Sequence, residues 1–460
     1  MKRLNLSKYS DLFSGYTELR VQENRINSIS MLDGIIIGNS RTSASGISAR
    51  SYTSGSWGFA SSPEINTNAI KYVIRTASNN ALFLCRHEGR READLPVSSA
   101  SGEWDFTTKK PVASQMDRID FVKNIDSYIN DKFIKLASRT VLLKELDMEK
   151  QLLTSTGSMA FSMTPRSLIY VILTVDTESG QVQLSETFGN LGQFEDVFVE
   201  PSHYHQRLDK LYERILRKAE GVFPRAGISQ CILDPNLAGI LAHEAIGHTT
   251  EADIVQGGSI AADYMNQMVA SPLITLVDFA NTALGKTCPV PIYIDDEGTA
   301  ARDVTVIEDG VLKSYMHNKE SALEFKTDLT GNARAYRFSD EPFIRMRNTA
   351  ILPGKNHLSE MIESVEDGYY LIQSSNGQAD STSEFMLGVV MGYEIKNGKL
   401  GRALKDTTIS GVAFDMLKTV TAVSNDMSWN CAGMCGKKQP IPVAMGGPAI
   451  KCMINIGGSK

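Results

Sequence analysis

Three residues that can bind a metal or move a proton lie within six positions of one another. His243, Glu244 and His248 form the pattern HEAIGH, inside LAHEAIGHTTEAD at 241–253. A catalytic zinc takes three protein ligands, and a glutamate beside the first histidine serves as the base that accepts a proton from water. The stretch fits a hydrolytic metal site, but it also fits an ordinary polar turn at a helix end. It supplies two ligands, so a third must come from elsewhere.

The spacing of the two histidines is unusual for a metal-binding helix. Ligands on one helix face are normally four residues apart, whereas His243 and His248 are five apart, which is about 140° around an ideal helix. Both rings reach one ion only if the helix is distorted. Gly247 precedes the second histidine and tolerates a kink, a π-bulge or the end of a helix. We therefore predict a distortion of the helix at Gly247.

Residue spacing alone leaves the third ligand open. The imidazole and thiol candidates are His203, His205, Cys431, Cys435 and Cys452. Cys431 and Cys435 have three residues between them in CAGMCGK, a spacing that can form half of a zinc site. Cys452 lies in an alternating stretch that favours a buried strand position. The two histidines precede a polar helix, where a capping or surface role is the simpler interpretation.

The first half of the chain alternates strand patterns with helical ones. Residues 17–41 alternate polar and apolar, which predicts successive strands with turns near Glu23-Asn24 and Leu32-Asp33-Gly34. Two further hairpins are predicted, a Gly/Ser-rich one at 46–62 and one centred on 178–180. Helical patterns cover residues 64–80, 116–137 and 204–224.

The character of the sequence changes after Pro224, so we predict an N-terminal domain at 1–224 and a C-terminal domain at 225–460. The second half begins with the HEAIGH helix and continues as short strands, with clear hairpins at 304–316 and 392–402. One helical stretch, 357–368, interrupts them. The predicted fold class is α+β, with a sheet-plus-helices N-terminal domain and a strand-rich, barrel-like C-terminal domain.

Composition excludes several classes of protein. The net charge is −6 with a pI near 5.8, so no basic surface for nucleic acid is expected. The longest apolar run, SLIYVILTV at 167–175, is too short to span a membrane. The six cysteines are scattered and no secretory signal is visible at the start. We therefore expect a cytoplasmic protein that binds neither nucleic acid nor membranes.

Several motifs, in order along nearly the whole chain, resemble the TldD/PmbA family. They are HEAIGHTTEAD (243–253), IDDEGT (294–299), TGNAR (330–334), RMRNTAILPGK (345–355), NGQAD (376–380), GMCGK (433–437), PVAMGGPAI (442–450) and INIGG (454–458). The opening strands at 17–41 are also similar to the family's first strands. TldD-like members carry an H-E-x-x-x-H motif and a distant cysteine, whereas PmbA-like members lack this set. The chain therefore resembles the TldD-like, metal-bearing side.

The resemblance implies a zinc-dependent peptidase. By position, His243 and His248 match the two histidine ligands, Cys435 in GMCGK matches the third ligand, and Glu244 matches the catalytic glutamate. The resemblance also implies work on unfolded or short peptides, as in the trimming of leader peptides or the turnover of flexible proteins. The implied partner is a PmbA-like chain, or a second copy of the same chain.

Some points stay open at the level of sequence. Cys431 is an additional cysteine that the family motif does not lead one to expect. Glu251 and Asp253 follow the second histidine closely enough for either to accept a hydrogen bond from a ligand. The acidic run at 295–297 favours turn and cap roles over a calcium or magnesium site. Glycine-rich segments at 257–263 and 374–381 are candidate edges for pairing with a peptide backbone.

Two other functions share these residues. A partner or regulatory subunit with a vestigial metal site is one, although the ligands and the base are all present. A metal-dependent hydrolase that cleaves an amide in a small molecule is the other, because the residues that activate water would be the same. A digest of peptides separates this second alternative from a peptidase.

Overall fold

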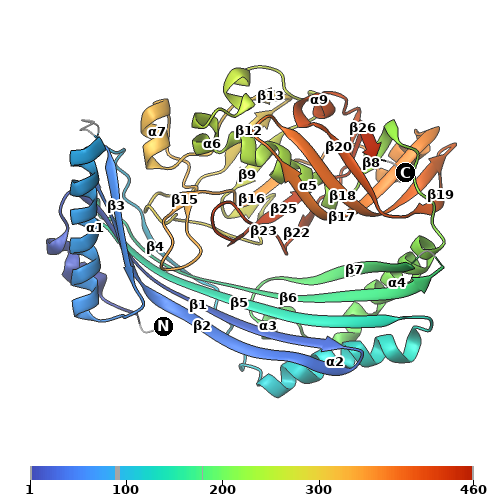
Figure 1. Cartoon of the computed structure of the whole chain (residues 1–460), viewed down its shortest axis with the longest axis horizontal. Coiled ribbons are helices and arrows are strands. Elements are labelled where there is room, and N and C mark those ends of the chain that lie inside the picture. The colour runs from blue at the N-terminus through green and yellow to red at the C-terminus, as the bar shows by residue number, and fades with distance from the viewer. Residues whose placement is uncertain (1–2, 89–93, 179, 458–460) are drawn as a thin grey trace.

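One long, curved sheet organises the first half of the protein. The computed structural model describes residues 3–88, 94–178 and 180–457. The sheet has the strand order β3-β2-β1-β5-β6-β4, with β7 also paired to β6. Figure 1 shows its long strands curving beneath the strand-rich second half. Its strands are β1 (Tyr16–Leu32), β2 (Ile35–Thr53), β3 (Ser56–Ser62), β4 (Ser101–Asp105), β5 (Ser138–Thr154), β6 (Met159–Thr177) and β7 (Gly180–Leu191).

The predicted turn near Glu23-Asn24 is wrong, because β1 runs without a break from Tyr16 to Leu32. Of the polar residues around that position, Gln22 and Asn24 point toward the second half of the protein, whereas Glu23 contacts Arg25 and Ser43 within the sheet. Gln22 and Asn24 are buried, and each side-chain amide donates to the carbonyl of Tyr336 at 2.6 Å. The turn predicted at Leu32-Asp33-Gly34 is present, where Asp33 and Gly34 both have positive φ. The β6–β7 hairpin predicted around 178–180 is present as well, although Ser179 lies outside the described residues.

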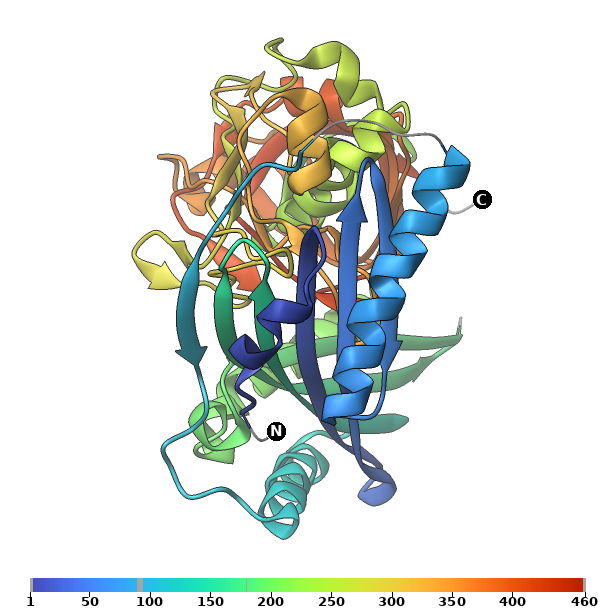
Figure 2. The ribbon, with the colours of Figure 1, turned by 90° about the vertical axis from the view of Figure 1, so that its left-hand side faces the viewer.

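Three longer helices accompany this sheet and begin or end near the predicted positions. Helix α2 starts at a capping box between Ser114 and Asp117, and it ends at Lys132, earlier than the pattern predicted. Helix α4 ends at Ala219, ahead of Gly221. Figure 2 shows α1 lying along β2 and β3. The helices of this half are η1 (Leu6–Leu12), α1 (Thr67–Glu88), α2 (Gln115–Lys132), α3 (Phe194–Val197), η2 (Pro201–Tyr204) and α4 (His205–Ala219).

A closed five-stranded barrel dominates the second half, as the sequence predicted. The order β17-β8-β26-β20-β18 closes through a further pairing of β17 with β18. The hairpin predicted at 392–402 joins β18 to β19 on the outside of the closed set. The strands are β8 (Gly227–Leu233), β17 (Asp367–Ala379), β18 (Glu384–Lys396), β19 (Lys399–Leu404), β20 (Thr407–Val412), β21 (Ala422–Val423) and β26 (Ile450–Gly457).

A six-stranded sheet, three short strand pairs and short helices complete the second half. The sheet has the order β13-β12-β9-β16-β25-β22, so β22 is an edge strand. Its strands are β9 (Leu276–Phe279), β12 (Val304–Glu308), β13 (Val311–Leu312), β16 (Asn348–Ile351), β22 (Ser428–Asn430) and β25 (Ala444–Gly447). The pairs are β10 (Thr282–Ala283) with β11 (Lys286–Thr287), β14 (Ala333–Arg334) with β15 (Phe343–Ile344), and β23 (Met434–Cys435) with β24 (Ile441–Pro442). The helices are α5 (Pro235–Leu241), η3 (Ala242–Gly247), η4 (His248–Thr250), α6 (Ala252–Gln256), η5 (Ile260–Tyr264), α7 (Lys319–Phe325), α8 (Leu358–Glu363) and α9 (Ala413–Lys418).

The two halves share an apolar core and a buried polar contact. Residues of α2, α4 and the long sheet pack in one cluster with Ile372, Met391 and Tyr393 of the barrel. On the polar side, Arg50 of the sheet lies between Glu18 and Glu297. These contacts fix the position of the long sheet relative to the barrel. The site described below lies between the two. The domain boundary at Pro224 itself stays a prediction.

The acidic run at 295–297 belongs to this contact. The Asp295 carboxylate accepts backbone N–H bonds from Glu297, Thr299 and Ala333, which is the predicted turn role. Asp296 binds Lys150 of the long sheet at 2.6 Å. The run therefore joins the two halves. In the described chain, no helix has the length and apolar character needed to cross a membrane.

Candidate metal centre

The helix that carries the HEAIGH pattern is distorted where the spacing required it. Asp234 caps α5 by accepting the N–H of Leu237, and Pro235 occupies the first turn. From Ala242 to Gly247 the backbone becomes a π-helix, in which the N–H of His248 donates to the carbonyl of His243. Residues five apart then lie on the same side. The two rings accordingly face each other, with centroids 5.1 Å apart.

Gly247 is needed for space rather than for its backbone freedom. Its φ of −57° and ψ of −51° are ordinary helical values. A Cβ added there would lie 2.0 Å from the sulfur of Met346, which is fully buried. The glycine therefore lets the π-helix pack closely against the segment between β15 and β16.

Gly247→Ala is expected to lower the free energy of unfolding by about 1–3 kcal/mol, because a side chain is forced into a packed core. Chemical denaturation of the purified protein measures this. Gly401→Ala is the matched control, since Gly401 is exposed and its nearest neighbour would be 3.5 Å from the new Cβ. Equal stability of the two variants would contradict the steric role of Gly247.

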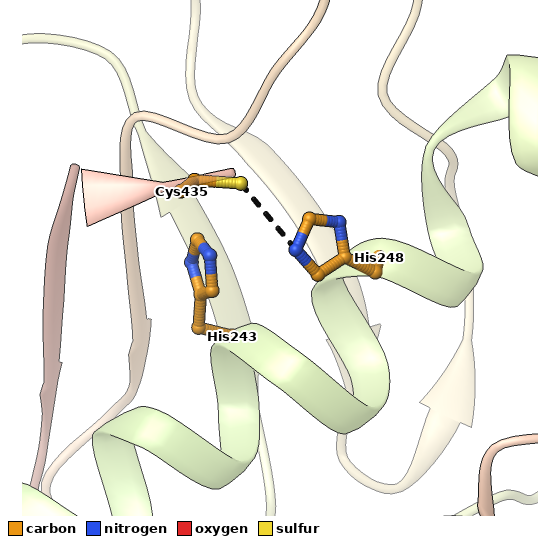
Figure 3. Close-up of side chains that lie close together, drawn as sticks. All are labelled: His243, His248 and Cys435. Atoms are coloured by element: carbon orange, nitrogen blue, oxygen red, sulfur yellow. Dashed lines mark hydrogen bonds between the residues drawn. The ribbon is translucent and has the colours of Figure 1, made fainter. Parts of the chain in front are cut away.

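Cys435 reaches the two histidines from a distant part of the chain. It lies on β23, and its Sγ is 3.4 Å from Nε2 of His248. Figure 3 shows the thiol and both rings turned toward one another. One ligand atom from each of His243, His248 and Cys435 lies within 4.8 Å of the others. Ligands of one tetrahedral zinc stand about 3.3–3.6 Å apart, so small movements bring this set to a single ion.

A buried arginine holds the loop that carries Cys435. The guanidinium of Arg345 donates to the carbonyls of Cys435, Lys437 and Gln439 at 2.7–2.9 Å, and Arg345 is fully buried. The position of the thiol is therefore set by main-chain contacts to a fixed cation. The sequence included Arg345 in the motif RMRNTAILPGK but assigned no role to it, because its partners follow some 90 residues later.

The other thiol and imidazole candidates lie outside the cluster. His205 stacks on Tyr128 with ring centroids 3.5 Å apart, and His203 lies in the short helix before α4. Cys452 is buried on β26 opposite Cys231 of β8. Cys431 lines the cleft described below, where its thiol contacts the carbonyl of Trp429. Among the described residues, only His243, His248 and Cys435 form a group of three side chains close enough to hold one metal ion.

Glu251 orients one of the two histidines. Its Oε2 lies 2.9 Å from Nδ1 of His248, which leaves Nε2 facing Cys435. Glu251 is fully buried and also pairs with Lys437 at 3.1 Å. Asp253 contacts Lys437 at 2.7 Å. The sequence did not decide whether Glu251 or Asp253 accepts a hydrogen bond from a ligand, and in the structure Glu251 contacts His248.

Electrostatics favour the thiolate form of the cysteine. Burial raises the pKa of Cys435, but hydrogen bonds with His243 and His248 outweigh burial and lower that pKa to about 4. Burial lowers the pKa of His248, yet the charge of Glu251 and the contact with Cys435 raise it to about 10. A thiolate beside an imidazolium is the pattern expected where a metal cation would replace the proton.

The donor set fits zinc. Two imidazoles and one thiolate are ligands that zinc prefers, and three of them leave a position for chemistry. Nδ1 of His243 is buried without a hydrogen-bond partner among the described residues. A nitrogen in that state costs free energy in a metal-free protein.

Glu244 lies between the cluster and an open cleft. Its Oε2 is 3.8 Å from Nε2 of His248, and its side chain is 27% exposed. The cleft beside it has a volume of about 730 Å³ and is lined by β6, β7 and α4 on one side. Residues from α5, β17 and β22 line the other side. Glu244 can therefore reach both the cluster and a molecule held between the long sheet and the barrel.

Comparisons with known proteins agree along the whole length. The PmbA/TldA metallopeptidase C-terminal domain matches residues 226–458, and domain 1 of the same family matches 17–81. A metalloprotease of Methanocaldococcus jannaschii is 31% identical over 98% of this chain and 100% of its own length. A zinc metalloprotease TldD homolog of Saccharolobus solfataricus is 27% identical over 90% of each chain.

Solved structures show the same fold. TldE from Thermococcus kodakarensis superposes with a TM-score of 0.75 at 18% identity, covering 99% of both chains. A Thermotoga maritima protein gives a TM-score of 0.77 at 17% identity, covering 96% of this chain and 95% of that one. With the sequence matches, these findings establish that the chain belongs to the PmbA/TldA (TldD/PmbA) family of metallopeptidases.

Proposed function

We propose that this metallopeptidase is a zinc-dependent enzyme that hydrolyses unfolded or short peptides. His243, His248 and Cys435 would hold the zinc, and Glu244 would act as the general base. The observation that carries the proposal is the convergence of the three ligand atoms within 4.8 Å, with the Glu244 carboxylate 3.8 Å from a ligand nitrogen and open to a cleft.

The residues have distinct roles in this reaction. Zinc, when bound, supplies Lewis-acid chemistry that polarises a peptide carbonyl and makes water acidic enough to lose a proton near neutral pH. Glu244 takes that proton from the attacking water and later delivers it to the departing amine. Glu251 holds the His248 ring with Nε2 toward the cluster. The two roles need two different carboxylates, one exposed to the cleft and one buried.

The cleft supports a substrate without fixed structure. Both β7 and β22 are edge strands and line it, so a peptide backbone can pair with either edge. Main-chain pairing depends little on the side chains of the substrate. Such low sequence selectivity suits leader-peptide trimming or the turnover of flexible proteins. Of the two glycine-rich segments, Ser374 and Gly377 line the cleft, whereas 257–263 leads into η5 and does not.

We also propose that the chain works as a dimer, with a PmbA-like chain or a second copy. TldE from Thermococcus kodakarensis shares the fold and supports a partner of this kind. The β1–β2 hairpin leaves Ile35 and Ile37 68% and 60% exposed, which suits coverage by a second chain. Light scattering on the chain alone, and with a co-expressed PmbA-like chain, distinguishes the two dimers. A monomer in both preparations would contradict the proposal.

Glu251→Gln is expected to weaken zinc binding by about 10- to 100-fold, because the carboxylate that orients His248 is lost. Competition with a chromophoric chelator measures the affinity. Asp253→Asn is the matched control, since Asp253 contacts Lys437 but no ligand, and a change of less than about threefold is expected there. Equal zinc affinity of both variants and the wild type would contradict the role of Glu251.

The proposed function is tested by digestion of a peptide mixture. Zinc-loaded protein, alone and with a co-expressed PmbA-like chain, is incubated with unstructured peptides and with a stably folded protein. We expect cleavage of the peptides, loss of cleavage with a chelator, recovery on addition of zinc and no cleavage of the folded protein. No peptide cleavage in either preparation would overturn the peptidase proposal and favour a non-catalytic subunit.

A further inference from the structure

The cleft beside Glu244 has a defined direction. Asn236, Ile240 and Glu244 recur every four residues along α5 and the π-helix, and all three line it. Helical residues rise about 1.5 Å each, so Asn236 and Glu244 lie about 12 Å apart along the axis. An extended peptide covers about 3.3 Å per residue. The cleft floor therefore accommodates three to four substrate residues between these two positions.

A cation without a direct partner lines the same cleft. Arg207 and Arg214 stand two turns apart on α4. Arg207 is already engaged, because it pairs with Glu186 and donates to the carbonyl of Thr187. Arg214 is half-buried, and no hydrogen bond or ion pair joins it to any residue that the structure describes. A guanidinium in this state is available to a ligand.

Arg214 lines the cleft together with Asp234 and Asn236. Burial raises the pKa of Asp234 to about 6, although backbone N–H groups and the charge of Arg214 act to lower it. The Asp234 carboxylate is committed to capping α5, through the N–H of Leu237 at 2.8 Å. Among the described residues, no ion pair joins this carboxylate to Arg214.

A second unused group lies at this end. Oδ1 of Asn236 is buried, and it has no hydrogen-bond partner in the described part of the chain. Asn236 lines the cleft, and a rotation of its side chain would bring this buried acceptor to a backbone N–H of a bound peptide, since leaving it unpaired costs free energy. Arg214 thus offers a donor fork in the cleft, and Asn236 offers an acceptor about two helical turns from Glu244.

We propose that Arg214 binds a carboxylate of the peptide substrate, three to four residues from the bond that is cleaved. The inference rests on the proposed peptidase function and adds a substrate preference to it. The carboxylate comes from an Asp or Glu side chain or from the free C-terminus of the peptide, because both present the same two oxygens to a guanidinium.

Matched peptides test this proposal. The series consists of unstructured octapeptides with an amidated C-terminus and one Glu moved along the sequence, each beside its Gln counterpart. A Glu-free peptide with a free C-terminus completes it. Mass spectrometry locates the cut, and KM and kcat are measured for wild type, Arg214→Gln, Arg214→Lys and Arg217→Gln. Arg217 is the matched control, since it is an exposed arginine on the same helix that does not line the cleft.

We expect wild type to show a KM about tenfold lower for a peptide with a carboxylate three to four residues from the cut than for its neutral counterpart. Arg214→Gln should remove this difference, Arg214→Lys should keep part of it, and Arg217→Gln should leave it unchanged. A preference for the free C-terminus alone, or for Glu at one position, identifies the source of the carboxylate. Equal KM values for charged and neutral peptides in wild type would overturn the proposal. An equal rise in KM for all peptides in Arg214→Gln would overturn it as well.

Binding separates this proposal from the peptidase function. Fluorescence anisotropy with Glu244→Gln protein compares the labelled Glu and Gln peptides without turnover. Tighter binding of the Glu peptide, lost in Glu244→Gln/Arg214→Gln, supports the carboxylate site even if no peptide is cleaved. Equal binding of both peptides overturns the site even if cleavage is seen.

Discussion

Cys435→Ala is expected to lower the zinc content of the purified protein from about one atom per chain to less than a tenth of that. Two imidazoles without the thiolate leave zinc with too few protein ligands for stable retention. Peptidase activity should fall in parallel, because it depends on the same ion. Elemental analysis after dialysis against a weak chelator measures the effect. The loop itself should persist, since Arg345 binds the main-chain carbonyls of Cys435 and Lys437, which the substitution does not remove.

The matched control is Cys431→Ala. Cys431 stands four positions earlier and lines the cleft, but it lies outside the ligand cluster. Burial raises the pKa of its thiol to about 11. Zinc should be retained at the wild-type level in this variant. Full retention in Cys435→Ala would show that the third ligand is not Cys435, and loss in Cys431→Ala would show that Cys431 also holds the metal.

Glu244→Gln is expected to reduce kcat by about 10²- to 10⁴-fold while the zinc content stays unchanged. The amide has nearly the same shape as the carboxylate but cannot accept the proton of the attacking water. KM should change little, because Glu244 contributes one side chain to a cleft with many. Steady-state kinetics on a cleaved peptide, with zinc analysis of the same sample, separate the two quantities.

Glu213→Gln serves as the control for this substitution. Glu213 is exposed on α4 and does not line the cleft, so kcat should remain at the wild-type value. An unchanged kcat in Glu244→Gln would exclude it as the general base. A loss of zinc in Glu244→Gln would instead indicate a role in holding the metal.

Interactions between residues close in the sequence were sufficient to predict several structural features. The five-residue spacing of the histidines required a distorted helix, and a π-helix is present from Ala242 to Gly247. Turn residues and alternation predicted the β12–β13 and β18–β19 hairpins and a barrel-like second half. These features depend on neighbours within a few residues, or on a repeated pattern. For that reason they can be inferred without knowing what packs against them.

The same reasoning failed where a distant contact decided the outcome. The polar residues near Glu23-Asn24 indicated a turn, yet β1 continues because Gln22 and Asn24 bind the carbonyl of Tyr336, more than 300 residues away in the chain. Gly247 was expected to supply conformational freedom, whereas its backbone is ordinary and a Cβ there would overlap the sulfur of the buried Met346.

The candidate site divides in the same way. The sequence determined on its own that His243, Glu244 and His248 could meet on one helix, since they are covalent neighbours and only a helical distortion was needed. Spacing left the third ligand open among five residues, and family resemblance indicated Cys435. The tertiary structure decided that Cys435 meets His248 from 187 positions away and that Glu251, rather than Asp253, orients the histidine. Contacts between residues so far apart in the sequence depend on how the barrel closes and on how Arg345 holds the loop that carries Cys435. Neither can be inferred from a local sequence pattern.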